Sequence, residues 1–113
     1  MPTVLVVEND VPAMRLMAWG LMEAGYEVAV AHVPEAPTHL QYRGPDVIVF
    51  NTLKRSEEKA QLVARFRELS PASKVIDVAV PSDDDPGPPF ADAHLTMPLS
   101  LSVLVSEIER LSA

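Results

Sequence analysis

Three short runs of apolar residues constrain the fold of this chain more than any other feature of its sequence. They are VLVV at residues 4–7, VIVF at residues 47–50 and the interrupted run VIDVAV at residues 75–80. A strand with one solvated face alternates apolar and polar residues, whereas a strand covered on both faces reads as continuous apolar sequence. The runs therefore predict strands in the middle of a sheet that has helices on both faces.

Segments with helical periodicity follow these strands. The apolar stripes of the three clearest helices are Met14, Met17, Ala18 and Leu21; Leu62, Val63, Phe66 and Leu69; and Leu101, Leu104, Val105, Ile108 and Leu111. Shorter strands are predicted at Val28–Ala31 and Ala93–Thr96, and a weak helix is predicted over residues 34–43, where Pro37 is unfavourable. Strand and helix thus alternate five times, which predicts an α/β fold with one parallel sheet.

Composition narrows the possible functions. The 113 residues suit a single domain, residues 1–113, and the absence of cysteine excludes disulfides, thiolate metal sites and cysteine nucleophiles. A net charge of −7 argues against nucleic acid as a partner. No apolar run approaches the ~20 residues of a membrane span, and no signal peptide is recognisable. We expect a cytoplasmic protein that binds neither membranes nor nucleic acid.

A ligand site in such a sheet lies where the strands end, at their carboxyl ends. The residues predicted there are Glu8, Asn9 and Asp10 after the first strand, Asn51 on the third, Ala79 on the fourth and Met97 after the fifth. Asp10 is also well placed to cap the following helix, which tolerates Pro12 in its first turn.

Taken together, these segments resemble the receiver domain of response regulators in two-component signalling. VLVVENDVPAMR resembles the family's first strand, acidic turn and helix start; GYEV and PDVIVFN resemble the entry to its second strand and its third strand. KVIDVAV resembles the fourth strand, and LTMPLS resembles the exit of the fifth with its proline, Pro98. The resemblance covers nearly the whole chain and implies the flavodoxin-like (CheY-like) doubly wound fold with strand order 2-1-3-4-5.

The positions that carry the family's chemistry differ here. Receivers accept a phosphoryl group on an aspartate, whereas the matching residue is Asn51. Ala79 occupies the position of the serine or threonine that contacts the phosphoryl oxygens, and Met97 that of the lysine. Glu8 keeps one acid of the usual pair, but the other is Asn9. The resemblance therefore implies a degenerate receiver, or pseudo-receiver, that is not an enzyme.

Metal binding should be affected in the same way. Mg²⁺ prefers oxygen ligands, and amide oxygens do not supply the charge that offsets its dehydration. Glu8 and Asp10 are the weak candidates for ligands, so we expect no resident metal or cofactor and weak or absent Mg²⁺ binding. Exchanging clustered carboxylates for amides also relieves their repulsion, which favours a domain held in one state.

The segment between the fourth and fifth strands departs from the family as well. Residues 81–90 contain four prolines, which predict that the family's fourth helix is missing or shortened. His94 occupies the position of the family's switch aromatic residue. It could sense pH, but we favour an ordinary strand histidine at a solvent edge. Asp77 interrupts the fourth strand; it pairs with a basic residue, or the strand is exposed, and we favour exposure.

Two apolar residues lie off the core stripe of the first helix, Leu16 and Trp19. Together with Leu99 and Val103 they form a candidate surface for a protein partner, although single exposed apolar residues are common. The partner would be a signalling protein such as a histidine kinase or another regulator, or a second copy of the chain. Two alternatives remain open: phosphorylation on another acid such as Asp10, or a small ligand in the crevice around Asn9, Asn51, Ala79 and Met97.

Overall fold

Five parallel strands form one sheet in the computed structural model, which describes residues 2–51, 56–79, 91–97 and 99–112. The strands are β1 (Thr3–Glu8), β2 (Glu27–Ala31), β3 (Val47–Asn51), β4 (Lys74–Ala79) and β5 (Ala93–Thr96). Their spatial order is β2-β1-β3-β4-β5, which confirms the predicted flavodoxin-like doubly wound topology. In this topology the chain reverses its direction of winding beside β1 and β3, so their carboxyl ends border the expected ligand crevice.

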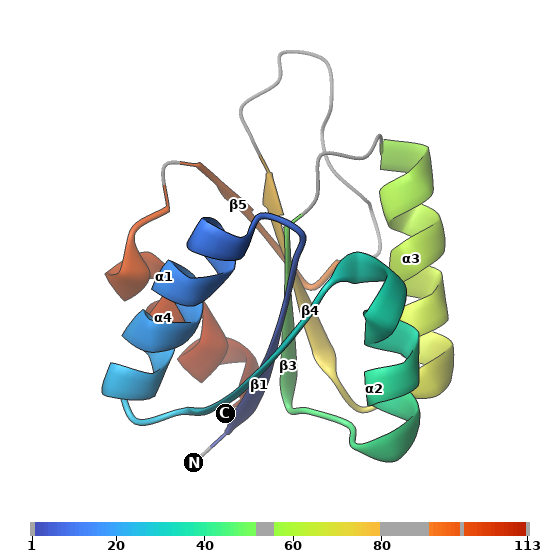
Figure 1. Ribbon diagram of the computed structural model, residues 1–113, viewed down its shortest axis with the longest axis horizontal. Helices are drawn as coiled ribbons and strands as arrows, with labels where there is room; N and C mark the ends of the chain where they lie inside the picture. The colour runs from blue at the N-terminus through green and yellow to red at the C-terminus, as the bar shows by residue number, and fades with distance from the viewer. Residues whose placement is uncertain (1, 52–55, 80–90, 98, 113) are drawn as a thin grey trace.

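Helices cover both faces of this sheet (Figure 1). On one face lie α1 (Val11–Glu23) and α4 (Leu101–Ser112). On the other face lie α2 (Ala36–Tyr42), which follows the short 3-10 helix η1 (Val33–Glu35), and α3 (Ser56–Leu69). None of the helices in the described part of the chain has the length and apolar character needed to cross a membrane.

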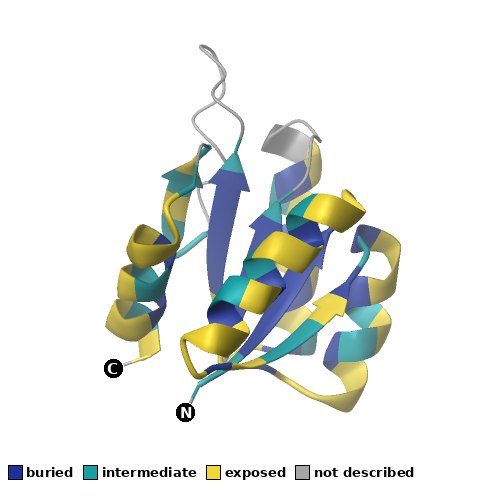
Figure 2. Cartoon of the chain, turned by 60° about the vertical axis from the view of Figure 1, so that its left-hand side comes forward, coloured by how far each residue is buried: buried dark blue, intermediate teal, exposed yellow. Residues whose placement is uncertain are grey.

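The continuous apolar strands supply both cores, because successive side chains point to opposite faces. Val4 and Val6 face α1 and α4, whereas Leu5 and Val7 face α2 and α3. Figure 2 shows the result: the central strands are buried, and exposed residues lie on the outer sides of the helices. In the second core the rings of Phe50 and Phe66 meet edge to face, with centroids 5.5 Å apart.

The two ends of α1 differ in whether capping hydrogen bonds are formed. Asp10 occupies the N-cap position, as predicted, but its side chain makes no capping hydrogen bond. At the other end Gly25 has a φ of 100°, a conformation that favours glycine. The amide of Tyr26 donates to Leu21 O and that of Gly25 to Met22 O, which is a Schellman motif. The helix exit is therefore fixed by backbone geometry.

The described residues between β4 and β5 form no helix. The described part of the chain as a whole contains four α-helices. This agrees with the prediction that one helix of the receiver fold is missing or shortened; residues 81–90 and their prolines lie outside the described residues. Asp92 fixes the entry to β5. Its carboxylate accepts a hydrogen bond from the Val75 amide at 2.8 Å and pairs with Arg67 at 3.1 Å.

The last helix differs from the predicted stripe at its first residue. Leu104 and Ile108 are buried, as expected, but Leu101 is exposed. Its side chain lies beside Gly20 of α1, where an added Cβ would come within 2.9 Å of Leu101 Cδ2. The absence of a side chain at Gly20 thus lets α1 and α4 approach each other.

Candidate functional site

Glu8 and Asn51 form the floor of the site. They are register partners on β1 and β3. Each lies two residues after a valine that faces α1 and α4, namely Val6 and Val49, so both lie on that face of the sheet. The Glu8 side chain is buried, and its Oε1 accepts a hydrogen bond from the Asp10 amide at 3.0 Å. Its Oε2 is buried too, and within the described part of the chain it has no hydrogen-bond partner. Among the described residues, Glu8 is therefore the carboxylate in the site with unused acceptor capacity.

The other two residues of the acidic turn point elsewhere. Asn9 is exposed, and its Oδ1 accepts a hydrogen bond from the Val33 amide at 2.9 Å. This bond ties the turn after β1 to the start of η1. Asp10 is exposed at the N-cap of α1. The turn thus contributes one inward carboxylate, from Glu8, to the floor of the site.

The ends of β4 and β5 complete the site with apolar groups. The backbone amide of Met97 donates to Ala79 O at 2.8 Å, which extends the pairing of the two strands. The Met97 side chain lies beside Asn51 in the lining of one cleft. Ala79 and Met97 therefore occupy the strand ends as predicted; Pro98 lies outside the described residues.

The cleft above Asn51 is almost entirely apolar. It has a volume of about 240 Å³ and opens between α1, α4 and the strand ends. The described residues that line it are Ala13, Leu16, Met17, Asn51, Met97, Leu99, Leu101 and Leu104. Where the sequence suggested a crevice around Asn9 and Ala79, the walls come from α1 and α4 instead, because Asn9 is turned toward η1.

Exposed apolar side chains gather on α1 and α4, which we call the α1–α4 face. Leu16 is 73% exposed and Trp19 is 65% exposed, as predicted from their position off the core stripe. Val103 is also exposed, while Leu99 is half-buried in the wall of the cleft. The sequence did not indicate that Met22 and Leu101 would join them.

A buried ion pair lies on the opposite face of the sheet. Lys59 Nζ of α3 is 3.2 Å from Asp77 Oδ1, and the two side chains are only 4% and 1% exposed. Nδ1 of His94 lies 3.5 Å from the other Asp77 oxygen, and the His94 side chain is 41% exposed. The expectation that Asp77 lies in an exposed strand is therefore wrong, because α3 covers it and supplies a cation. His94 does lie on the edge strand, as predicted, but beside a carboxylate.

The sequence contained a signal for this pair. Lys59 lies three and four residues before Leu62 and Val63, which places it on the inner stripe of α3. A lysine on an inner stripe and an aspartate inside an apolar strand each need an opposite charge. The packing of α3 on β4 brings the two charges together.

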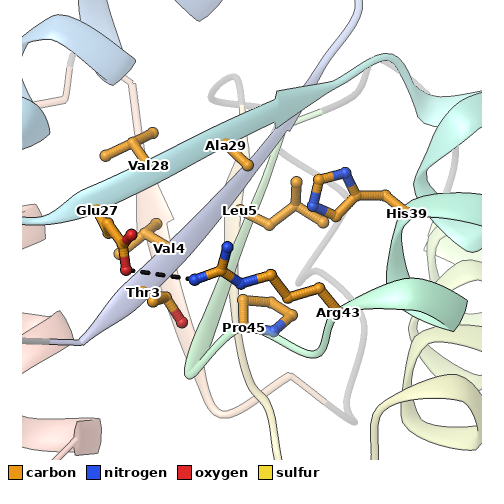
Figure 3. Close-up of a pocket in the computed structure, with 9 residues that line it drawn as sticks. All are labelled: Thr3, Val4, Leu5, Glu27, Val28, Ala29, His39, Arg43 and Pro45. Carbon is orange, nitrogen blue, oxygen red and sulfur yellow. Dashed lines mark hydrogen bonds and ion pairs between the residues drawn. The ribbon is translucent and has the colours of Figure 1, made fainter.

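A second pocket lies away from the strand ends, between β2 and α2 (Figure 3). The side chains of Arg43 and Glu27 form an ion pair across its mouth, with 3.4 Å between Nη2 and Oε2. His39 reaches toward it from α2. Both partners of the ion pair are largely exposed, so it contributes little to stability.

The strand order and the acidic turn after β1 define the class of fold: the chain has the CheY-like fold of response-regulator receiver domains. A response regulator from Thermotoga maritima is 25% identical, with a TM-score of 0.84 over 99% of this chain and 98% of that one. A receiver domain from Methylobacillus flagellatus is 20% identical, with a TM-score of 0.85 and 98% of each chain covered.

A further similar structure is that of the histidine kinase ThkA in complex with the response regulator TrrA. The matching chain is 19% identical, with a TM-score of 0.84 and 100% of each chain covered. No protein-family model matches the sequence, and no curated protein matches it either. The fold is thus established by structural similarity, at low sequence identity.

Proposed function

We propose that the protein is a receiver-like signalling domain of two-component type that is not phosphorylated at the usual position and acts through protein contacts. One observation carries this proposal: β3 ends on Asn51, an amide that faces an apolar cleft. In receivers the residue at this position is the aspartate that attacks phosphorus. A carboxylate can do this, whereas a neutral amide is a poor nucleophile.

The surroundings of Asn51 support the same proposal. Phosphoryl transfer depends on groups that neutralise and orient the phosphoryl oxygens. Ala79 and Met97 offer a methyl group and a thioether at the positions of the family's hydroxyl and lysine. At these two positions the protein therefore offers neither a hydroxyl donor nor a cation for a transferred phosphoryl group.

The donor set is also a poor fit for Mg²⁺. Glu8 is the one carboxylate on the floor of the site, and one of its oxygens already accepts a hydrogen bond. The Asn9 oxygen is committed to the Val33 amide. Among the described residues, no three His, Cys, Asp or Glu side chains converge on a possible metal site. We infer weak Mg²⁺ binding and no enzymatic activity.

The α1–α4 face is the surface that we assign to protein contacts. Large apolar and aromatic side chains such as Leu16 and Trp19 contribute most to binding when a partner covers them. Among the similar structures, TrrA is a response regulator in complex with a histidine kinase. A histidine kinase, another regulator or a second copy of the chain is the partner we propose, in the cytoplasm and without nucleic acid.

Trp19 provides the test, because it is the only tryptophan of the chain. We expect its emission to shift to shorter wavelengths when a histidine-kinase phosphotransfer domain is added, or when the protein concentration rises if the partner is a second copy. Leu16→Asp should weaken this response about tenfold. Val30→Asp, which changes an exposed apolar residue on β2, should leave it unaltered. An equal loss in both variants would contradict the assignment of the surface.

A further inference from the structure

We propose that the cleft above Asn51 is a binding site for a small amphiphilic amine. The apolar body of the molecule would lie between α1 and α4, and its protonated amine would bind Asn51 and Glu8. This inference goes beyond the proposed function, because contacts on the outer α1–α4 face do not require a ligand in the cleft.

The walls determine the apolar part of the ligand. Seven of the eight described lining residues are apolar, namely Ala13, Leu16, Met17, Met97, Leu99, Leu101 and Leu104. An apolar cavity of about 150 Å³ is large enough for benzene, so a cleft of about 240 Å³ can hold one ring with a short side chain. The flexible thioethers of Met17 and Met97 can adapt to the shape of such a ring.

The floor determines the polar part. The Asn51 side chain makes no hydrogen bond within the described part of the chain, so its carbonyl oxygen can accept one from a ligand. Glu8 is its register partner on the neighbouring strand, and neighbouring strands lie about 4.8 Å apart. Glu8 is not among the described lining residues, so we infer that the donor group extends past Asn51 toward the buried, unpartnered Oε2 of Glu8.

The charge of Glu8 selects the sign of the ligand. A buried carboxylate oxygen without a hydrogen-bond partner is destabilising, and a protonated amine would form a charge-assisted hydrogen bond with it. Carboxylates and phosphates would be repelled. Mg²⁺ carries the right sign, but it gives up its water reluctantly and prefers several oxygen ligands, which these apolar walls lack. An amine with an apolar body satisfies the walls and the floor together.

Methionine methyl groups provide a direct measurement of binding. In a protein labelled with ¹³C at these methyls, Met17 and Met97 report from the cleft, while Met22 on the outer side of α1 serves as an internal control. We expect phenethylamine to shift the Met17 and Met97 signals until they saturate and to leave Met22 unchanged. The neutral analogue 2-phenylethanol should bind at least tenfold more weakly. Signals that never saturate, or that shift equally for Met22, would overturn the proposal.

Two variants test the role of the floor. Glu8→Gln preserves the shape of the side chain and should weaken phenethylamine binding about tenfold, while binding of 2-phenylethanol stays the same. Asn51→Asp adds a second carboxylate and should tighten phenethylamine binding.

If Glu8→Gln fails to fold, the effect of Asn51→Asp and the preference of the natural protein for the amine decide the question. Equal affinity for the amine and the alcohol would overturn the assignment of Glu8. Covalent phosphorylation does not enter this experiment, so its failure leaves the proposed function standing.

Discussion

At the scale of single residues, the pair Lys59–Asp77 should be the most sensitive polar contact in the protein. Removing one partner of a buried ion pair leaves an uncompensated charge. We expect Lys59→Met to lower the free energy of unfolding by about 3–5 kcal/mol, measured by chemical denaturation. Replacing both partners, as in Lys59→Met with Asp77→Leu, should recover most of this loss.

The exposed pair Arg65–Glu68 is the matched control for that experiment. Its side chains are 50% and 70% exposed, so Arg65→Ala should change the free energy of unfolding by only about 0.5 kcal/mol. A similarly small effect of Lys59→Met would show that the buried pair is not formed in solution.

Tyr26 should make stability depend on alkaline pH. Burial raises the pKa of its phenol above the ordinary value of 10.0, and the nearby carboxylate of Glu109 raises it further. Above pH 10.0 the unfolded chain releases this proton while the folded chain retains it. The free energy of unfolding therefore falls as pH rises through that range. Tyr26→Phe should remove this part of the decline, as measured by denaturation at successive pH values.

Tyr42 is the control for this titration, because its side chain is 86% exposed. The variant Tyr42→Phe should show the same decline as the natural protein. If Tyr26→Phe also loses stability in the same way above pH 10.0, other groups are responsible for the pH dependence.

At the scale of elements, the exit of α1 depends on the conformation of one glycine. A residue with a Cβ is strained at a φ of 100°, so Gly25→Ala should lower the free energy of unfolding by about 1 kcal/mol. Gly25→Asn should lose less, because asparagine tolerates a positive φ better than alanine does. Thermal or chemical unfolding would check this order, and equal losses would mean that the helix exit changes its conformation.

Most elements were predictable because each has a local cause. The strand predicted at Ala93–Thr96 has those bounds in the structure. The third strand, predicted from the apolar run at residues 47–50, ends one residue later, at Asn51. The weak helix predicted over residues 34–43 forms as α2, although Pro37 was expected to disfavour it. The reason is that Pro37 lies in its first turn, where the missing N–H would have no partner within the helix.

The site was predictable in its residues but not in its shape. The position of Asn51, Ala79 and Met97 follows from where their strands end. The apolar cleft depends on how α1 packs against α4, and the direction of Asn9 depends on a hydrogen bond to Val33 that spans 24 positions of sequence. Neither arrangement has a local sequence signal.

At the scale of the whole molecule, the two faces of the sheet have different characters. The face with α1 and α4 carries the cleft and the exposed apolar side chains, whereas the face with α2 and α3 encloses the buried ion pair. Among the described residues, Glu8 is the one buried carboxylate at the strand ends, so there is little charge repulsion for a cation to relieve. We therefore expect a domain whose binding surface is permanently available.

The most direct test of this account is the intact mass of the protein after incubation with acetyl phosphate and Mg²⁺, measured beside the Asn51→Asp variant. The account predicts no added phosphoryl group on the natural protein. The variant, in which a carboxylate again ends β3 next to Glu8, separates the loss of the nucleophile from the loss of the hydroxyl and lysine groups. A phosphoryl group on the natural protein would contradict the central claim, and Asp10 would be the first residue to examine for the modification.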